Sequence, residues 1–122
     1  MALGDTNTPY LIDIGVNLTN SRFDKDRDQV ISQAKEAGVI SQIITGTNAK
    51  ESLEAFELTQ IYPQLFSTAG CHPHDAKGLS ANDFAEIKSL LSNDSVVAVG
   101  ECGLDFNRNF SPPDVQETVF RQ

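Results

Sequence analysis

Residues 96–101 read Val96-Val97-Ala98-Val99-Gly100-Glu101. An apolar run rich in β-branched residues and closed by glycine is typical of a strand that is buried on both faces of a parallel sheet. Glu101 is the first polar residue after this run. Because the carboxyl ends of the strands form the functional edge of parallel α/β folds, we expect Glu101 to be a metal ligand or a base. The alternative is a structural glutamate that caps a neighbouring backbone or pairs with Arg108.

The rest of the chain repeats this strand–helix pattern. Strand patterns cover residues 10–16, about 42–45, 65–69 and 96–99, and helical patterns cover about 24–37, 48–62 and 80–91, with a last helix that begins after an N-cap at Ser111. The pairs Asn48/Glu51 and Ser80/Asp83 have the spacing of helix capping boxes. Strands that alternate with helices predict βαβ units and a parallel sheet. A compact flavodoxin-like sheet is the alternative architecture.

Composition and charge limit the class of protein. The chain has 122 residues, 39% of them hydrophobic, and a formal net charge of −8, which fits one globular domain and argues against a nonspecific nucleic-acid coat protein. A metallonuclease is not excluded, because bound cations can supply positive charge at a phosphate. The sequence has no membrane-spanning run and no signal peptide, so we expect a cytoplasmic protein. Residues 1–9 are expected to form a flexible tail, and Cys71 and Cys102 to be free thiols.

Two histidines follow the third predicted strand, in the segment His72-Pro73-His74. Neutral imidazole can bind a metal ion, and imidazolium can hold a phosphate. We expect His72 to belong to the site and His74 to be a loop residue.

Other polar residues follow the predicted strands. Asp13 would need a hydrogen bond or a cation if it is buried, and Asn17 is either a ligand contact or a turn residue. Asp105 is expected to orient a ligand or Arg108, and Arg108 is the base near Glu101 that could meet a phosphate. The segment Gly46-Thr47-Asn48 fits a loop and helix cap better than an anion site.

Several other chemistries find little support. The sequence contains no GxSxG elbow, no GxxxxGK[ST] loop and no GxGxxG after the first strand, so serine-hydrolase, P-loop and dinucleotide chemistry are not indicated. Cys71 adjoins His72, but neighbouring residues rarely have the geometry of a nucleophile and its base.

Four segments taken together resemble the TatD family of metal-dependent deoxyribonucleases. They are Asp13-Ile14-Gly15-Val16-Asn17-Leu18-Thr19, Ile44-Thr45-Gly46-Thr47-Asn48, Ser67-Thr68-Ala69-Gly70-Cys71-His72-Pro73-His74 and Gly100-Glu101-Cys102-Gly103-Leu104-Asp105-Phe106. The resemblance runs from about Tyr10 to Gln122. It implies a (β/α)8 barrel related to the amidohydrolases and a cytoplasmic, Mg²⁺-dependent 3′→5′ exonuclease. The implied substrate is DNA with single-stranded 3′ ends, or RNA, and the implied role is in DNA repair.

The same resemblance assigns residues. Glu101 matches the family's glutamate metal ligand, and His72 matches the histidine of its Gly-x-His-Pro motif, which contacts substrate phosphate. We add Asn17, Asp105 and Arg108 as substrate-binding residues. Mg²⁺ is the expected metal, with Mn²⁺ and Zn²⁺ as alternatives. Many members carry a His-x-His metal pair where this sequence has Gly15 and Asn17.

Length is the main departure from the family. A full barrel takes about 250 residues and eight strands, whereas this sequence contains four strand patterns, so we expect the truncated N-terminal half of such a barrel, nearly inactive by itself. The alternatives are an amidohydrolase-like enzyme for a small ester, amide or lactone, and a non-catalytic half-barrel that self-associates through its open sheet.

Overall fold

The computed structural model describes residues 9–122, so the predicted tail over residues 1–9 lies, apart from Pro9, outside the described residues. Strands and α-helices alternate along the chain, in the order β1 (Leu11–Val16), α1 (Arg27–Glu36), β2 (Val39–Ile44), α2 (Ala49–Ile61), β3 (Leu65–Ala69), α3 (Ala81–Leu90), β4 (Val96–Val99) and α4 (Pro113–Arg121). Two short 3₁₀ helices, η1 (Ser21–Phe23) and η2 (Pro73–Gly78), follow β1 and β3. None of the described helices is long and apolar enough to cross a bilayer.

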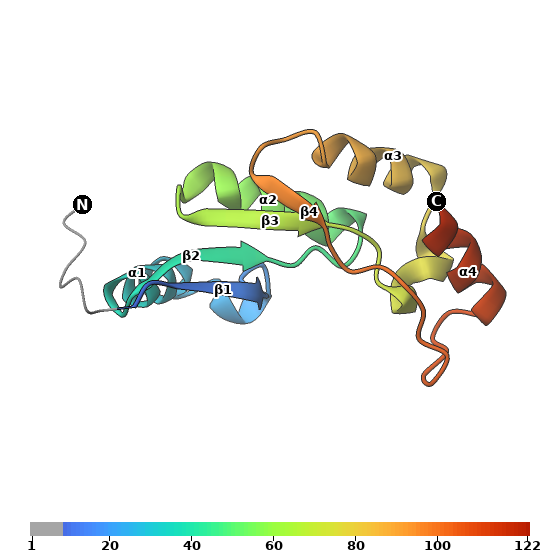
Figure 1. Ribbon diagram of the computed structural model, residues 1–122, viewed down its shortest axis with the longest axis horizontal. Coiled ribbons are helices and arrows are strands. Elements are labelled where there is room, and N and C mark those ends of the chain that lie inside the picture. The colour runs from blue at the N-terminus through green and yellow to red at the C-terminus, as the bar shows by residue number, and fades with distance from the viewer. Residues whose placement is uncertain (1–8) are drawn as a thin grey trace.

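The four strands form one parallel sheet in the order β1-β2-β3-β4. Each strand lies beside its neighbour in the sequence, and all four run toward the same end of the molecule (Figure 1). A flavodoxin-like sheet reverses its strand order partway, so this alternative is excluded. Consecutive β/α units in sequential order are the arrangement of a (β/α)8 barrel, and the predicted fold class of four such units is confirmed.

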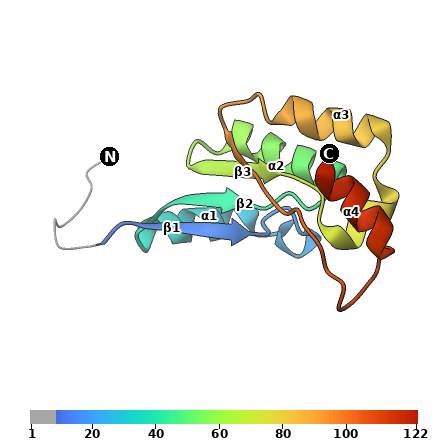
Figure 2. The same ribbon diagram turned by 45° about the vertical axis from the view of Figure 1, so that its right-hand side comes forward.

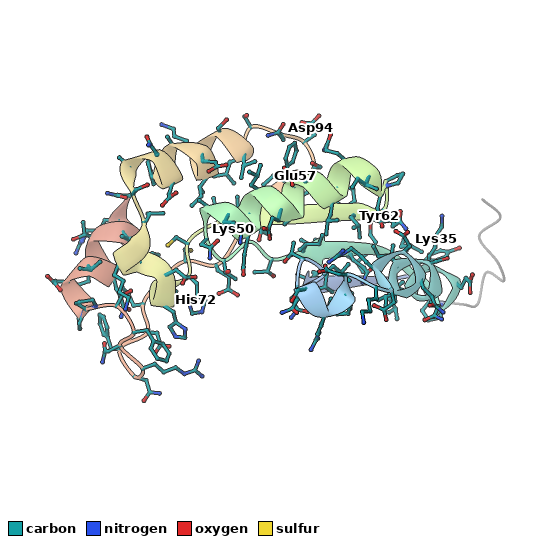
Figure 3. All side chains as sticks on the ribbon, turned by 180° about the vertical axis from the view of Figure 1, so that it is seen from behind. Lys35, Lys50, Glu57, Tyr62, His72 and Asp94 are labelled. Carbon is teal, nitrogen blue, oxygen red and sulfur yellow. The ribbon has the colours of Figure 1, made fainter. Side chains whose placement is uncertain are left out.

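The core lies between the sheet and the helices on one of its faces, where views from opposite sides place α1 and α2 (Figures 1 and 3). One cluster of buried side chains joins β2 and β3 to α1, α2 and the segment after β1 through Leu18, Ile31, Ile44, Ala55 and Leu65. A second cluster joins β3 and β4 to α2 and α3 through Ala49, Ala69, Ile87, Leu90 and Val96. These contacts hold the strands in register.

The prediction that the strand at 96–99 is buried on both faces is wrong. Val97 is 48% exposed and Val99 is 61% exposed, because they alternate with the buried Val96 and so point to the sheet face opposite the helices against which Val96 packs. Within residues 9–122, β4 is also an edge strand, beside β3. β1 is the opposite edge, where Ile14 is 74% exposed, and Asp13 is likewise exposed rather than buried. A β-branched run therefore identifies the strand but not what covers it.

The ends of the first three helices follow the capping signals with two differences. Asn48 and Ser80 cap α2 and α3 as predicted, although the carboxylate of Glu51 accepts a hydrogen bond from the Thr47 hydroxyl instead of completing its capping box. Gly38 has φ +100° at the end of α1, a conformation that favours glycine. The first helix begins at Arg27, after η1, rather than at residue 24.

Helix α4 is capped differently from the prediction. Its N-cap is Pro112, not Ser111, and Ser111 is fully buried. The helix packs against η2, and Figure 2 shows α4 and the loop before it at the end toward which the strands run. The residues after β3 and after β4 are thereby brought together.

Candidate active site at the strand ends

An open groove of about 890 Å³ lies across the carboxyl ends of the strands. Its lining includes Asn17 after β1, Thr45 and Thr47 after β2, and Glu101 after β4. The groove therefore joins two of the predicted site residues, Asn17 and Glu101, although they are distant in the sequence. Within the segment after β2, the Gly46 amide donates to the Thr68 hydroxyl, so this amide is engaged in joining β2 to β3.

Gly70 allows the ends of β3 and β4 to approach each other closely. A Cβ at this position would lie 2.4 Å from the carbonyl oxygen of Glu101, so a side chain would force the two strand ends apart. The buried hydroxyl of Ser52, on α2, accepts a hydrogen bond from the Gly70 amide at 3.2 Å. Helix α2 thus holds the backbone at Gly70, two residues before His72.

His72 and Glu101 meet in the structure. The distance between His72 Nε2 and Glu101 Oε2 is 3.5 Å, with 27% and 41% of the two side chains exposed. The His72 amide donates to the Thr47 carbonyl oxygen at 2.8 Å, which ties this loop to the end of β2. Figure 3 shows His72 beside η2, at the end of the molecule toward which the strands run. Both side chains are open enough for a ligand to reach them.

A backbone hydrogen bond sets the tautomer of the His72 ring. The His74 amide donates to His72 Nδ1 at 3.1 Å, so Nδ1 carries the lone pair and a neutral ring carries its proton on Nε2. The proton on Nε2 faces the Glu101 carboxylate. In this form His72 can donate a hydrogen bond to an anion, but Nε2 has no lone pair for a metal ion.

His74 lies in η2, in the segment that follows β3, and its ring contacts the loop that follows β4. Its Nε2 lies 2.7 Å from Asp105 Oδ2. This hydrogen bond, followed by one from the Arg108 amide, holds the pKa of Asp105 below its usual value. The ring of His74 also packs edge-on against the rings of His72 and Phe110, with centroids 4.2 Å and 4.7 Å away.

Gln116 and Ser111 support this arrangement. Gln116 on α4 is 1% exposed. Its side-chain oxygen accepts a hydrogen bond from the Asp105 amide at 2.7 Å. Its side-chain nitrogen donates hydrogen bonds to the carbonyl oxygens of Asp105 and Ser111. The Ser111 hydroxyl accepts the Lys77 amide and donates to the His74 carbonyl oxygen, both at 3.0 Å. Sequence reasoning missed both residues, because a glutamine on an amphipathic helix has no distinguishing pattern and Ser111 resembled an N-cap.

Asp105 does not orient the Arg108 side chain, which was one of the two roles predicted for it. Only the Arg108 amide meets Asp105, at 3.1 Å from Oδ1, so Asp105 caps a turn and does not hold the guanidinium. Within residues 9–122 Arg108 forms no salt bridge with Glu101, and its side chain is exposed. The alternative in which Glu101 is a structural partner of Arg108 is therefore excluded.

Cys71 is poorly suited to act as a nucleophile. Burial, with smaller contributions from Asp75 and Asp83, raises the pKa of its thiol to about 11, so the thiolate is scarce at neutral pH. Its sulfur instead lies 3.6 Å from the His72 carbonyl oxygen. Cys71 and Cys102 are both free, as predicted.

A metal ion would find one ligand here. Glu101 offers an accessible carboxylate, a donor that suits hard divalent cations, but within the described chain no three His, Cys, Asp or Glu side chains are grouped to hold an ion. Among the described residues, Glu101 is therefore a single candidate ligand and not a complete metal site.

The family model and the relatives that match this sequence point to the same family. The family model for TatD related DNase matches residues 12–122. The chain is 57% identical to the 3′-5′ ssDNA/RNA exonuclease TatD of Pectobacterium carotovorum over 111 residues and 52% identical to the protein of the same name from Salmonella typhimurium. These matches cover 90% and 91% of this chain but 43% of each relative, so the chain spans less than half of their length.

Solved structures agree with the sequence matches. A TatD-family hydrolase from Entamoeba histolytica superposes with a TM-score of 0.84 at 30% identity, over 93% of this chain and 44% of that one. A TatD homologue from Escherichia coli K12 gives a TM-score of 0.80 at 26% identity, over 91% and 44%. The order of the strands, the meeting of His72 with Glu101 and the match over residues 12–122 lead to one conclusion: the chain belongs to the TatD related DNase family.

Proposed function

We propose that the whole protein to which this chain corresponds is a metal-dependent 3′→5′ exonuclease that hydrolyses the phosphodiester bonds of single-stranded DNA or RNA. The observation that carries the proposal is the 3.5 Å approach of His72 Nε2 to Glu101 Oε2 at the strand ends. The names of the 57% and 52% identical relatives, 3′-5′ ssDNA/RNA exonucleases, support the substrate class and the polarity.

Glu101 and His72 have different roles in this proposal. Glu101 contributes one oxygen ligand to a divalent cation, with Mg²⁺ as the expected ion and Mn²⁺ or Zn²⁺ as alternatives; the ion would activate water and neutralise charge on the phosphate. His72 donates its Nε2 proton to a phosphate oxygen, because Nδ1 already accepts the His74 amide. The isolated chain, with one ligand, is expected to be nearly inactive.

Asn17 and Arg108 are proposed substrate contacts. Asn17 is exposed and lines the same groove as Glu101, so its amide can bond to a sugar or a phosphate. The exposed Arg108 guanidinium follows a turn that Asp105 caps, and it can meet a phosphate further along the strand. Asp105 acts indirectly in this proposal, by shaping the loop rather than by touching the substrate.

A chimera tests the substrate class. Residues 12–122 replace the aligned segment of the Pectobacterium carotovorum relative, and the purified chimera is given single-stranded oligonucleotides labelled at either end, together with a panel of small esters, amides and lactones. We expect Mg²⁺-dependent shortening from the 3′ end. Turnover of the small molecules with intact oligonucleotides would favour the amidohydrolase-like alternative and overturn the proposal.

Self-association of the isolated chain is a second proposal, favoured by the apolar side chains on its edge strands. Ile12, Ile14, Val97 and Val99 are between 48% and 74% exposed, and open strands of this kind pair with other chains. Light scattering is expected to detect oligomers that Val99→Lys reduces; a stable monomer at high concentration would contradict this.

Cytoplasmic residence remains part of the proposal. The free thiols of Cys71 and Cys102 support it, because thiols persist in reducing compartments. Fractionation of cells that express the whole protein would test it.

A further inference from the structure

We propose that Asp105 and His74 form a positioning pair that fixes the orientation and the tautomer of the His72 imidazole. The inference rests on the proposed function for its effect on activity, but not for its effect on the His72 ring. Neither residue is proposed to touch the substrate. Their role is to keep the proton of His72 on Nε2, where it can meet a phosphate.

Asp105 is held more firmly than an exposed loop aspartate. Its Oδ1 accepts the Asn107 and Arg108 amides, both at 3.1 Å, and its own amide and carbonyl are bound by the buried side chain of Gln116. Oδ1 is therefore hydrogen-bonded within the turn, while Oδ2 lies 2.7 Å from His74 Nε2. Such a short contact to a carboxylate is a strong hydrogen bond.

His74 in turn is fixed at both ends. Asp105 holds its ring, and the buried Ser111 hydroxyl donates to its carbonyl oxygen at 3.0 Å. The His74 amide donates a hydrogen bond to His72 Nδ1 at 3.1 Å. The His74 ring lies edge-on to the His72 ring, with an interplanar angle of 67°. Movement of His74 would therefore loosen both contacts that define the His72 ring.

The consequence is chemical as well as geometric. If Nδ1 lost the His74 amide, neutral His72 could carry its proton on Nδ1 and present a lone pair at Nε2. That tautomer cannot donate to the phosphate and would place a lone pair beside the Glu101 carboxylate. A hydrogen bond at one nitrogen of a histidine commonly decides which state the other nitrogen presents.

The test uses four variants in two settings. His74→Ala and Asp105→Ala break the pair, His74→Gln keeps a side-chain donor for Asp105, and Lys77→Ala is the control, an exposed side chain on the same 3₁₀ helix. Ring ¹⁵N shifts of His72 are measured by NMR on the 122-residue chain at alkaline pH, and kcat and KM on the chimera described above.

We expect the Nε2-protonated tautomer of His72 in the unmodified chain and in Lys77→Ala, and a mixture of tautomers in both pair-breaking variants. In the chimera these two variants should lower kcat by about 10- to 100-fold with little change in KM, because misorientation acts on the transition state, and His74→Gln should recover most of the loss. An unchanged tautomer in folded His74→Ala would overturn the proposal.

Other outcomes also decide the matter. If His74→Gln is as inactive as His74→Ala while the His72 tautomer stays fixed, His74 touches the substrate itself and the positioning role is wrong. If the unmodified chimera folds but cleaves no nucleic acid, the proposed function fails, and the NMR result on the chain still supports or contradicts the positioning pair.

Discussion

The carbonyl oxygen of Glu101 occupies space that any side chain at Gly70 would need, since a Cβ there would lie 2.4 Å from it. The atom that such a Cβ would meet belongs to the backbone of Glu101, so the clash could not be relieved by the movement of a flexible side chain. The meeting of His72 with Glu101 depends on this approach, because Glu101 is one of the two residues and His72 lies two positions after the other, Gly70.

Gly70→Ala is expected to lower the free energy of unfolding by about 1–3 kcal/mol, as overpacking does, and to disturb the ring signals of His72. Gly78→Ala is the matched control, because nothing lies within 4 Å of a Cβ at that position. Urea unfolding followed by circular dichroism measures both. Equal stability of the two variants would contradict the close approach.

Ser111→Ala removes a fully buried hydroxyl that bonds to Lys77 and His74. It leaves the part-buried Lys77 amide and His74 carbonyl oxygen without this partner, which costs about 1 kcal/mol. Ser89→Ala, at an exposed site on α3, should change stability by no more than about 0.5 kcal/mol. The difference in urea midpoints between the two variants tests whether Ser111 joins η2 to α4.

The two thiols should react at different rates. Because the pKa of Cys71 is raised to about 11, few Cys71 thiolates exist at about pH 8, and the side chain is partly buried, whereas Cys102 is exposed. Iodoacetamide followed by peptide mass spectrometry should modify Cys102 first. Faster modification of Cys71 in the folded chain would contradict the low thiolate population.

Asp105 should give the fold a specific acid dependence. Its pKa is lowered in the folded state, chiefly by His74, so its bonds stabilise the fold above the unfolded value of about 3.9 and are lost as the pH falls through the lower folded value. Asp105→Asn should therefore lose less stability than the unmodified chain between about pH 7 and about pH 3. Asp94→Asn, at an exposed site, is the control and should behave like the unmodified chain.

The sequence predicted the order of the elements because each depends on local signals. Asn48 and Ser80 mark helix starts, Gly38 marks a helix end, and the apolar runs mark the strands. Burial of β4 could not be predicted in the same way, because it depends on what covers the sheet face toward which Val97 and Val99 point.

Part of the site was equally accessible from the sequence. Glu101 and His72 each follow a strand, and parallel strands bring such residues together. The hydrogen bonds of Asp105, Gln116 and Ser111 that support the site could not be predicted from the sequence. They depend on the packing of α4 against η2, a tertiary contact between segments that are distant in the sequence. The contact between His74 and Asp105 could not be predicted for the same reason, because the two residues lie 31 positions apart.

The role of Glu101 as a metal ligand is tested by the rate at which the chimera shortens a 5′-labelled single-stranded DNA in Mg²⁺, compared between the unmodified protein and Glu101→Gln. Glu117→Gln, an exposed position on α4, controls for loss of charge. We predict a loss of at least about 100-fold for Glu101→Gln and none for Glu117→Gln, with both variants folded. Unchanged cleavage by Glu101→Gln would contradict the assignment of Glu101 as a metal ligand.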